Sequence, residues 1–570
     1  MKKLVSLLVA VLCLTTASAC VKKSTNPLTT NPLTILVMDS TQALLNGAQV
    51  KIGKQTYTTS FDGRIVLQPE QVTAKTLQVS CEGYESKKQD LDGSALILVS
   101  LTAKEGRHEK EPRYTLGKAM KGRIEAREAE MVYASAVMAD EAMDAMPAYK
   151  GPRPIQNDAT AGRLTAGEVN DFAKWQLWAH VLDSTHKPFI GTWGLEPRER
   201  YTVQVQTKDG YPVANYPVQL KDTKGNTVFQ AITDNTGKAE LWNGLIGQPA
   251  AVNQPAMQTI VLDEPCEVSD AVDVLFVFDA TGSMGDELRY LQEEMKDVIA
   301  RAKEATGGLS IRTGAVVYRD HSDDYLTRIS RLTEDIATTQ AFIDKQHASG
   351  GGDYPEAVPE ALMAALNSAG WSDNARARIA FLILDAPCHE DSATLALLHE
   401  QVLNAAAMGV RIVPVVCSGL QESGEYLMRA IALATNGTSF FLTDDSGIGL
   451  PHLKPTTDSL KVEHLNDMLV RTIVQFSKMP ECQPFDETEE LTDNEFFLPN
   501  PFTTADLEAD PTIPNGEGVH YLIDISGKLL GVYKGDIDQL PITNHQLPIG
   551  IYFIKTYYEG IWHTKKILVR

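Results

Sequence analysis

A short run of acids and hydroxyls follows an apolar stretch in the middle of the chain. In "VDVLFVFDATGSM", Asp279 ends the apolar run, and Thr281 and Ser283 follow it at intervals of two residues. A sharp turn after a strand would fold both hydroxyls back beside the carboxylate. Mg²⁺ takes octahedral oxygen ligation and keeps several waters, so hydroxyls and carboxylates at this spacing predict a divalent-cation site. The alternative is that Asp279 and Ser283 cap a helix that begins near Asp286.

Two further acids lie where they could join such a site. Asp385 ends a second apolar run, "FLILD", which favours the metal interpretation over helix capping. Asp353 lies in the loop "SGGGDYPEA", followed by Pro355 and Glu356. It is interpreted as a third ligand, as a residue one step beyond the ligand, or as the N-cap of a helix beginning at Pro355. As a ligand it would tighten metal binding but lower the residual positive charge that attracts an acidic partner.

The elements that must position these residues alternate between two patterns from about residue 271 to 478. Short apolar runs predict buried parallel strands, and segments with helical periodicity separate them. The strands are expected at 272–279, 312–320, 378–385 and 410–417, and the helices at 285–305, 355–369, 393–409 and 462–478. This order predicts an α/β doubly wound, Rossmann-like sheet. Ligands of such sheets bind outside the carboxyl ends of the strands, where Asp279 and Asp385 are expected.

Taken together, these motifs resemble the von Willebrand factor A domain with its metal-ion-dependent adhesion site. The resemblance covers residues 266–482. It implies that Thr281 and Ser283 bind one Mg²⁺ directly, with Mn²⁺ or Ca²⁺ as alternatives, and that Asp279 and Asp385 bind mainly through waters. The family often has a threonine where this chain has Asp353. A protein or glycan ligand is the partner that the resemblance implies.

Four of the seven cysteines are candidates for disulfides. Cys266 and Cys482 flank the predicted domain, and the two ends of such a domain tend to lie close together. An exported protein allows a bridge between them, and two unrelated thiols are the alternative. A second bridge between Cys388 and Cys417, which follow strands expected to be adjacent, is the alternative to two separate thiols.

The first residues have the pattern of an export signal. Lys2 and Lys3 precede an apolar run over residues 4–14, which is too short to cross a bilayer, and residues 1–19 are interpreted as a signal peptide. Cys20 follows small residues and resembles the acylated cysteine of a bacterial lipobox, so cleavage by ordinary signal peptidase and lipidation both remain open. Residues 20–32 repeat NPLT and predict a polar tether. No later apolar run reaches about 18 residues, so no transmembrane helix is expected.

The remaining segments predict a multi-domain protein with several β-sandwiches. Residues 33–103 resemble the carboxypeptidase regulatory-like sandwich, and residues 197–263 resemble an immunoglobulin-like sandwich. Residues 104–196 are interpreted as a linker with helices and residues 483–495 as a second linker. Residues 496–570, with "LPIGIYFIKTYYEG" and a terminal "TKKILVR", resemble the C-terminal sorting domain of the type IX secretion system, a small β-sandwich that carries proteins across the outer membrane of Bacteroidetes.

Composition and motifs narrow the class of function. A net charge of −22 over 570 residues argues against nucleic acid or an anionic membrane surface as a partner, so a membrane is expected only through a lipid anchor at Cys20. No HExxH, GxSxG or Walker motif is present, and no enzyme is predicted. The chain is interpreted as a cell-surface or secreted binding or adhesion protein, exported by the type IX machinery, or as an outer-membrane lipoprotein. The alternatives are an envelope assembly scaffold with a structural metal site and, third, a hydrolase that uses Asp279, Asp353 and Asp385.

Overall fold

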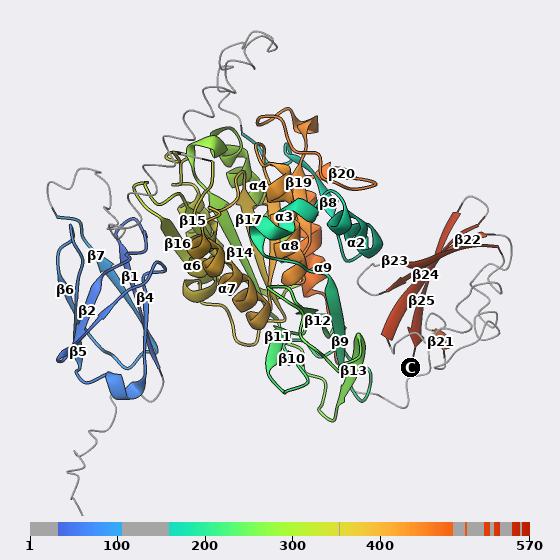
Figure 1. Ribbon diagram of the computed structural model, residues 1–570, viewed down its shortest axis with the longest axis horizontal. Helices are drawn as coiled ribbons and strands as arrows, with labels where there is room; N and C mark the ends of the chain where they lie inside the picture. The colour runs from blue at the N-terminus through green and yellow to red at the C-terminus, as the bar shows by residue number, and fades with distance from the viewer. Residues whose placement is uncertain are drawn as a thin grey trace, which may run out of the picture.

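The computed structural model describes a central α/β domain with β-rich units around it (Figure 1). The described residues are 32–104, 159–352, 354–480 and 482, together with five strands of the tail between residues 496 and 569. The predicted signal peptide, Cys20, Asp353 and the linker at 483–495 lie outside these residues, as does most of the predicted tether and residues 105–158 of the first predicted linker.

An eight-stranded sheet in the order β16-β15-β14-β17-β18-β19-β8-β20 forms the centre of the molecule. Strands β14, β15, β17, β18 and β19 are parallel, whereas β16 and β8 pair antiparallel with their neighbours. The chain adds β15 on one side of β14 and later β17 on the other, so the strand order reverses beside β14, which is the position where doubly wound sheets bind ligands. The strands are β8 Thr165–Val169, β14 Ala271–Asp279, β15 Ser310–Tyr318, β16 Thr327–Thr333, β17 Ala377–Leu384, β18 Val410–Val416, β19 Ser439–Leu442 and β20 Val462–His464.

Helices cover both faces of this sheet because its central strands are apolar on both sides. In β14, Phe276 and Phe278 belong to one hydrophobic core and Leu275 and Val277 to the other. Parallel strands buried on two faces read as continuous apolar runs, as they do here. The first core is closed by α4 Leu288–Ala305, α5 Ile336–Ile343 and α9 Leu465–Ser477, and the second by α6 Val358–Ser368, α7 Ser392–Met408 and α8 Glu422–Ala434. The expected doubly wound α/β architecture is therefore present.

The central sheet extends beyond the predicted limits of 266–482. Strand β8, from the segment interpreted as a linker, pairs with β19, with Phe440 opposite Glu168. Two helices follow it, α2 Trp175–Asp183 and α3 Lys187–Trp193. Trp178 is fully buried and stacks on Tyr426 of α8, with 5.9 Å between ring centroids. Residues 165–193 are thus part of the central domain and not a linker.

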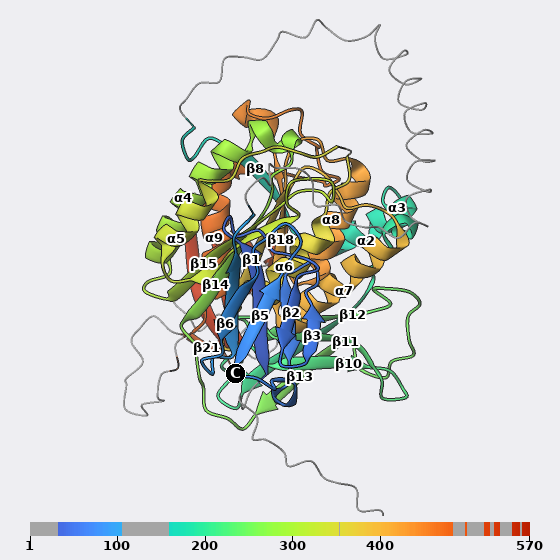
Figure 2. The ribbon, with the colours of Figure 1, turned by 90° about the vertical axis from the view of Figure 1, so that its left-hand side faces the viewer.

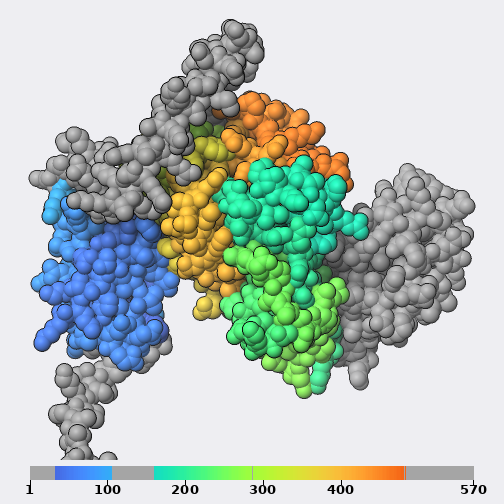
Figure 3. Space-filling view, viewed as in Figure 1, coloured from blue at the N-terminus to red at the C-terminus, as the bar shows by residue number. Residues whose placement is uncertain are grey.

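Five strands between β8 and β14 form two small sheets that pack against the central domain. They are β9 Glu199–Thr207, β12 Lys238–Asn243 and β13 Met257–Leu262 in one sheet, and β10 Pro217–Lys221 and β11 Thr227–Ile232 in the other. Asp234 forms an ion pair with the buried Arg411 and accepts a hydrogen bond of 2.9 Å from the Asn436 side chain. Apolar side chains of these small sheets belong to the same hydrophobic core as those of α7 and α8. In Figure 3 the green segment is continuous with the central domain. Residues 197–263, which resemble an immunoglobulin-like sandwich in sequence, thus pack directly against the central domain.

Residues 33–101 form two further sheets with a hydrophobic core of their own. The strands are β1 Leu33–Asp39, β4 Arg64–Leu67 and β7 Leu96–Leu101 in one sheet, and β2 Gln49–Ile52, β3 Gln55–Thr58, β5 Thr76–Ser80 and β6 Lys87–Asp90 in the other. The unit, drawn in blue, faces the viewer in Figure 2. It contacts strand β16 at the edge of the central sheet, where Leu44 N–H donates to Thr327 O at 3.0 Å and Ile329 N–H donates to Gln42 O at 3.1 Å. These backbone bonds cover an otherwise open sheet edge.

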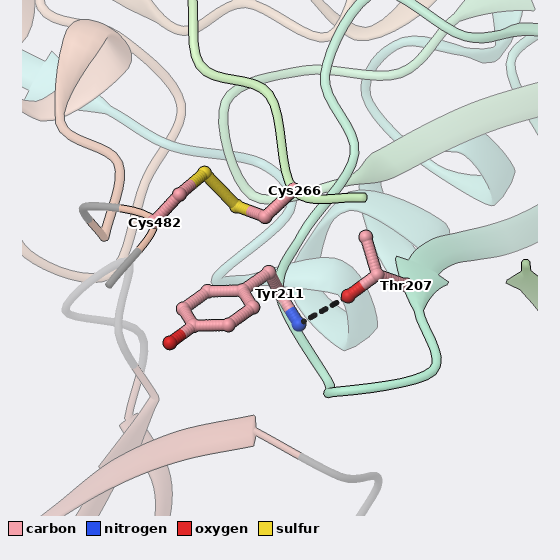
Figure 4. The surroundings of a disulfide bond; sticks show 4 residues. All are labelled: Thr207, Tyr211, Cys266 and Cys482. Carbon is pink, nitrogen blue, oxygen red and sulfur yellow. Dashed lines mark hydrogen bonds between the residues drawn. A yellow bond between two sulfur atoms is a disulfide. The ribbon is translucent and has the colours of Figure 1, made fainter. Parts of the chain in front are cut away.

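One of the two predicted disulfides is present. Cys266 and Cys482 are bonded across 216 residues of sequence, beside Tyr211 (Figure 4). Closing so long a loop stabilises a folded domain by about 2–4 kcal/mol, because it restricts the unfolded chain. The bridge between Cys388 and Cys417 is not formed, and both are buried free thiols. The two side chains belong to different hydrophobic cores on opposite faces of the sheet, which keeps their sulfur atoms apart.

The described tail residues form one five-stranded sheet in the order β21-β25-β24-β22-β23. The strands are β21 Phe496–Leu498, β22 Gly518–Asp524, β23 Leu529–Gly535, β24 Gly550–Tyr558 and β25 Ile561–Val569. Across the described parts of the chain, no helix combines the length and the apolar character needed to cross a bilayer.

Candidate metal centre

The turn after β14 brings Asp279, Thr281 and Ser283 together. Asp279 Oδ1 accepts hydrogen bonds from the Thr281 N–H at 2.8 Å and from Thr281 Oγ1 at 2.6 Å. The hydroxyl oxygens of Thr281 and Ser283 are 3.2 Å apart. Helix α4 begins at Leu288 with Glu287 as its N-cap, after a short 3₁₀ turn, so the alternative in which Asp279 and Ser283 cap this helix is wrong.

Asp385 follows the neighbouring strand β17 and lies beside Asp279. Phe278 is opposite Ile383 in the register of β14 and β17, which places both carboxylates at the same edge of the sheet. Asp279 and Asp385 are buried, and one oxygen of each, Oδ2 and Oδ1, has no hydrogen-bond partner. Burial and the charge of Asp385 raise the pKa of Asp279 to about 7. Burial also raises the pKa of Asp385 to about 6, although a hydrogen bond from Ser283 opposes this shift.

The loop of residues 349–352, here called the glycine loop, lies against this turn. The Gly282 N–H donates to Gly350 O at 3.0 Å, and both oxygens of Asp323 accept from the Gly351 N–H, at 2.9 and 3.1 Å. A Cβ on Gly351 would lie 3.2 Å from the Thr281 Cβ, and Gly351 has a positive φ of 70°. Glycine is required here because the backbone approaches the threonine so closely. The loop therefore closes one side of the candidate site.

Glu356, which follows this loop, is a site residue that the spacing argument did not select. Its side chain is 2% exposed, and Oε2 has no hydrogen-bond partner. Burial, followed by the charges of Asp279 and of three further carboxylates, raises the pKa of Glu356 to about 10. The signal was present in the sequence, since Glu356 stands three residues after Asp353 in the same motif.

Helix α6 begins later than the sequence suggested. Its first residue is Val358 and its N-cap is Ala357, so the interpretation of Asp353 as the N-cap of a helix beginning at Pro355 is wrong. Asp353 itself lies outside the described residues, and its role as a ligand stays a prediction.

Two further buried groups surround the acids. Tyr318 ends β15 opposite Asp279, and its buried hydroxyl has no hydrogen-bond partner. Glu287 accepts a hydrogen bond from His452 Nε2 at 2.9 Å, and the other ring nitrogen of His452 lies 2.9 Å from Asp444. These contacts hold the loop that follows β19 against the start of α4.

The described residues fit a Mg²⁺ ion with mixed hydroxyl and carboxylate ligands. Two oxygens bound to one octahedral Mg²⁺ at right angles are about 3 Å apart, close to the separation of the Thr281 and Ser283 hydroxyls. The unpartnered oxygens of Asp279 and Asp385 provide buried negative charge, whereas Ser283 is exposed. No cluster of three or more His, Cys, Asp and Glu side chains suited to a metal occurs among the described residues. A site that takes two ligands from hydroxyls does not require such a cluster.

Comparison with known proteins bears on the central domain. The family model described as von Willebrand factor A domain matches residues 273–442. The alpha-protein kinase vwkA of Dictyostelium discoideum is 32% identical over 123 residues, which are 21% of this chain and 19% of that protein. An ariadne-like RING finger protein of Acanthamoeba polyphaga mimivirus is 37% identical over 86 residues, or 15% of this chain and 8% of that protein. The chain thus spans less than a fifth of the length of either relative. Residues 273–442 of this chain form a von Willebrand factor A domain.

Proposed function

We propose that this protein is an exported binding or adhesion protein whose von Willebrand factor A domain holds Mg²⁺ and uses it to bind a protein or glycan. Thr281 and Ser283 would bind the ion directly, and Asp279 and Asp385 would act mainly through waters. The observation that carries the proposal is the pair of buried, unpartnered carboxylate oxygens beside an exposed hydroxyl. In such an arrangement the buried carboxylates stabilise the cation, and the coordination position that faces the solvent stays open to a ligand oxygen.

A capture experiment on the full chain tests this function. Immobilised protein is incubated with host matrix or cell-envelope extract in buffer with MgCl₂, and then washed with EDTA. We expect bound protein or glycan to elute with EDTA and to rebind when Mg²⁺ is restored, with Mn²⁺ tested in parallel. Binding that is indifferent to EDTA would favour the envelope scaffold with a structural metal.

The proposal includes export by the type IX secretion system through residues 496–570. The described tail strands, which end in the Lys-containing β25, support this assignment because sorting domains of that system are small β units. The final location is then the cell surface or the medium, or the outer membrane if Cys20 is lipidated. The β units of residues 33–103 and 197–263 are proposed to be of the carboxypeptidase regulatory-like and immunoglobulin-like types.

Deletion of residues 496–570 is expected to leave the protein in the periplasm of a host that has this secretion system. Cell fractionation and immunoblotting measure the distribution. A deletion of residues 33–103, which form a separate core, is the control and should still reach the outside. If the tail deletion is also found outside the cell, the export assignment is wrong.

A further inference from the structure

Glu356 is a buried carboxylate without a cationic partner. Its side chain is 2% exposed, Oε2 accepts no hydrogen bond, and no ion pair to it occurs among the described residues. An ionised carboxylate buried without a partner is very unfavourable. Glu356 therefore requires a positive charge or a proton beside it.

The backbone fixes Glu356 between two loops of the metal centre. Its N–H donates to Pro387 O at 2.9 Å, and the residue pairs as a parallel bridge with Cys388, in the loop that begins with Asp385. On its other side, Glu356 Oε1 lies 3.1 Å from the point that a Cβ on Gly351 would occupy, and that point is 3.2 Å from the Thr281 Cβ. The Glu356 carboxylate and the Thr281 side chain therefore both border the position of the missing side chain at Gly351.

The cations and histidines around the site are engaged elsewhere. Arg319 donates to the backbone carbonyls of Ala280 at 3.1 Å and His347 at 2.8 Å. His389 lies 3.0 Å from Asp320, and His321 lies 3.0 Å from Glu360. In the metal-free protein a proton on Glu356 removes its charge, because burial raises its pKa to about 10, and a bound ion would take the place of that proton.

We infer that Glu356 supports the metal centre as a nearby acid, without binding the ion directly, and that its charge makes the loaded site prefer neutral oxygens, such as glycan hydroxyls, over carboxylates. Mg²⁺ with Asp279, Asp385 and Glu356 leaves one net negative charge, which repels an incoming anion. With Asp279 and Asp385 alone, the site and its Mg²⁺ together would carry no net charge. This inference rests on the Mg²⁺ site proposed above.

Calorimetric titration of the full chain with MgCl₂ tests the role of Glu356. The Glu356→Gln variant should bind Mg²⁺ about 10–100-fold more weakly than the wild type, the usual effect of removing a supporting ligand. Glu390→Gln is the matched control, because Glu390 is an exposed acid five residues after Asp385. In EDTA the Glu356→Gln variant should melt at or above the temperature of the wild type, since the cost of burying a titratable acid has been removed, and this measurement also shows that it is folded.

Sodium acetate serves as the carboxylate probe for the ligand class. Acetate should leave the Mg²⁺ affinity of the wild type unchanged and tighten that of Glu356→Gln, since a ligand on the ion and the ion stabilise each other's binding. If acetate increases the Mg²⁺ affinity of the wild type, the preference for neutral oxygens is wrong. Equal Mg²⁺ affinities of wild type and Glu356→Gln would overturn the role of Glu356 but leave the site intact, whereas a wild type that binds no Mg²⁺ would refute the proposed function itself.

Discussion

The Asp279→Ala variant is expected to bind no Mg²⁺ while its central sheet stays folded. Asp279 supplies the carboxylate that orients Thr281 through two hydrogen bonds, so its loss removes negative charge and also releases a hydroxyl ligand. The fold should survive, because a buried carboxylate beside a second one destabilises the metal-free folded state, and the substitution removes this destabilising group. Calorimetry measures the affinity, and circular dichroism measures the fold.

Asp467→Ala is the control for this variant. Asp467 lies on α9 with its side chain 50% exposed and pairs with Arg301 at the surface, so its removal changes the net charge equally without touching the site. The control should bind Mg²⁺ like the wild type. An Asp279→Ala variant with wild-type affinity would show that the ion, if bound, lies elsewhere.

Mg²⁺ is expected to stabilise the protein much more at pH about 8 than at pH about 5. The pKa values of Asp279 and Asp385 are raised from 3.8 to about 7 and about 6, so the folded, metal-free state binds protons more tightly than the unfolded chain. Its stability is therefore highest at low pH and falls as the pH rises through these values. The charge of Glu287 contributes to the raised pKa of Asp385.

The size of this effect follows from linkage. A raised pKa costs up to about 1.4 kcal/mol per pH unit and per group between the unfolded and folded pKa values, so the two aspartates alone should cost the metal-free protein on the order of 4 kcal/mol between pH 5 and 8. Bound Mg²⁺ keeps the carboxylates ionised and offsets this loss, while protons compete with the ion at pH 5. Thermal unfolding in EDTA and in MgCl₂ at both pH values measures the difference.

Asp279→Asn is the control for the pH experiment, because it removes one of the titrating groups with little change of shape. Its stability in EDTA should depend less on pH than that of the wild type over the same range. Equal Mg²⁺ stabilisation of the wild type at both pH values would contradict the assignment of these carboxylates to the metal centre.

The sequence by itself determined the central sheet and the two carboxylates at its edge. The apolar run before Asp279 and the run before Asp385 can only be buried as parallel strands covered by helices on both faces, and the carboxyl ends of such strands share one edge. The flanking positions of Cys266 and Cys482 made their bridge one of two possibilities, because the two ends of a doubly wound domain lie close together, and the structure decided between a bridge and two separate thiols.

Only the tertiary structure decided what depends on contacts between distant segments. Strand β8 contains Gly167 and Glu168, lacks an apolar run, and is a strand only because it pairs with β19 some 270 residues later. Cys388 and Cys417 follow adjacent strands, but their side chains belong to the hydrophobic cores on opposite faces of the sheet. Which face a side chain takes depends on the exact residue at which its strand ends. Glu356 follows Asp353 in the same sequence motif, but nothing in the motif indicates that its side chain is buried. Its burial near Thr281 arises because the glycine loop folds over the turn after β14, and the backbone of that loop, rather than any spacing of side chains, brings Glu356 beside the candidate metal centre.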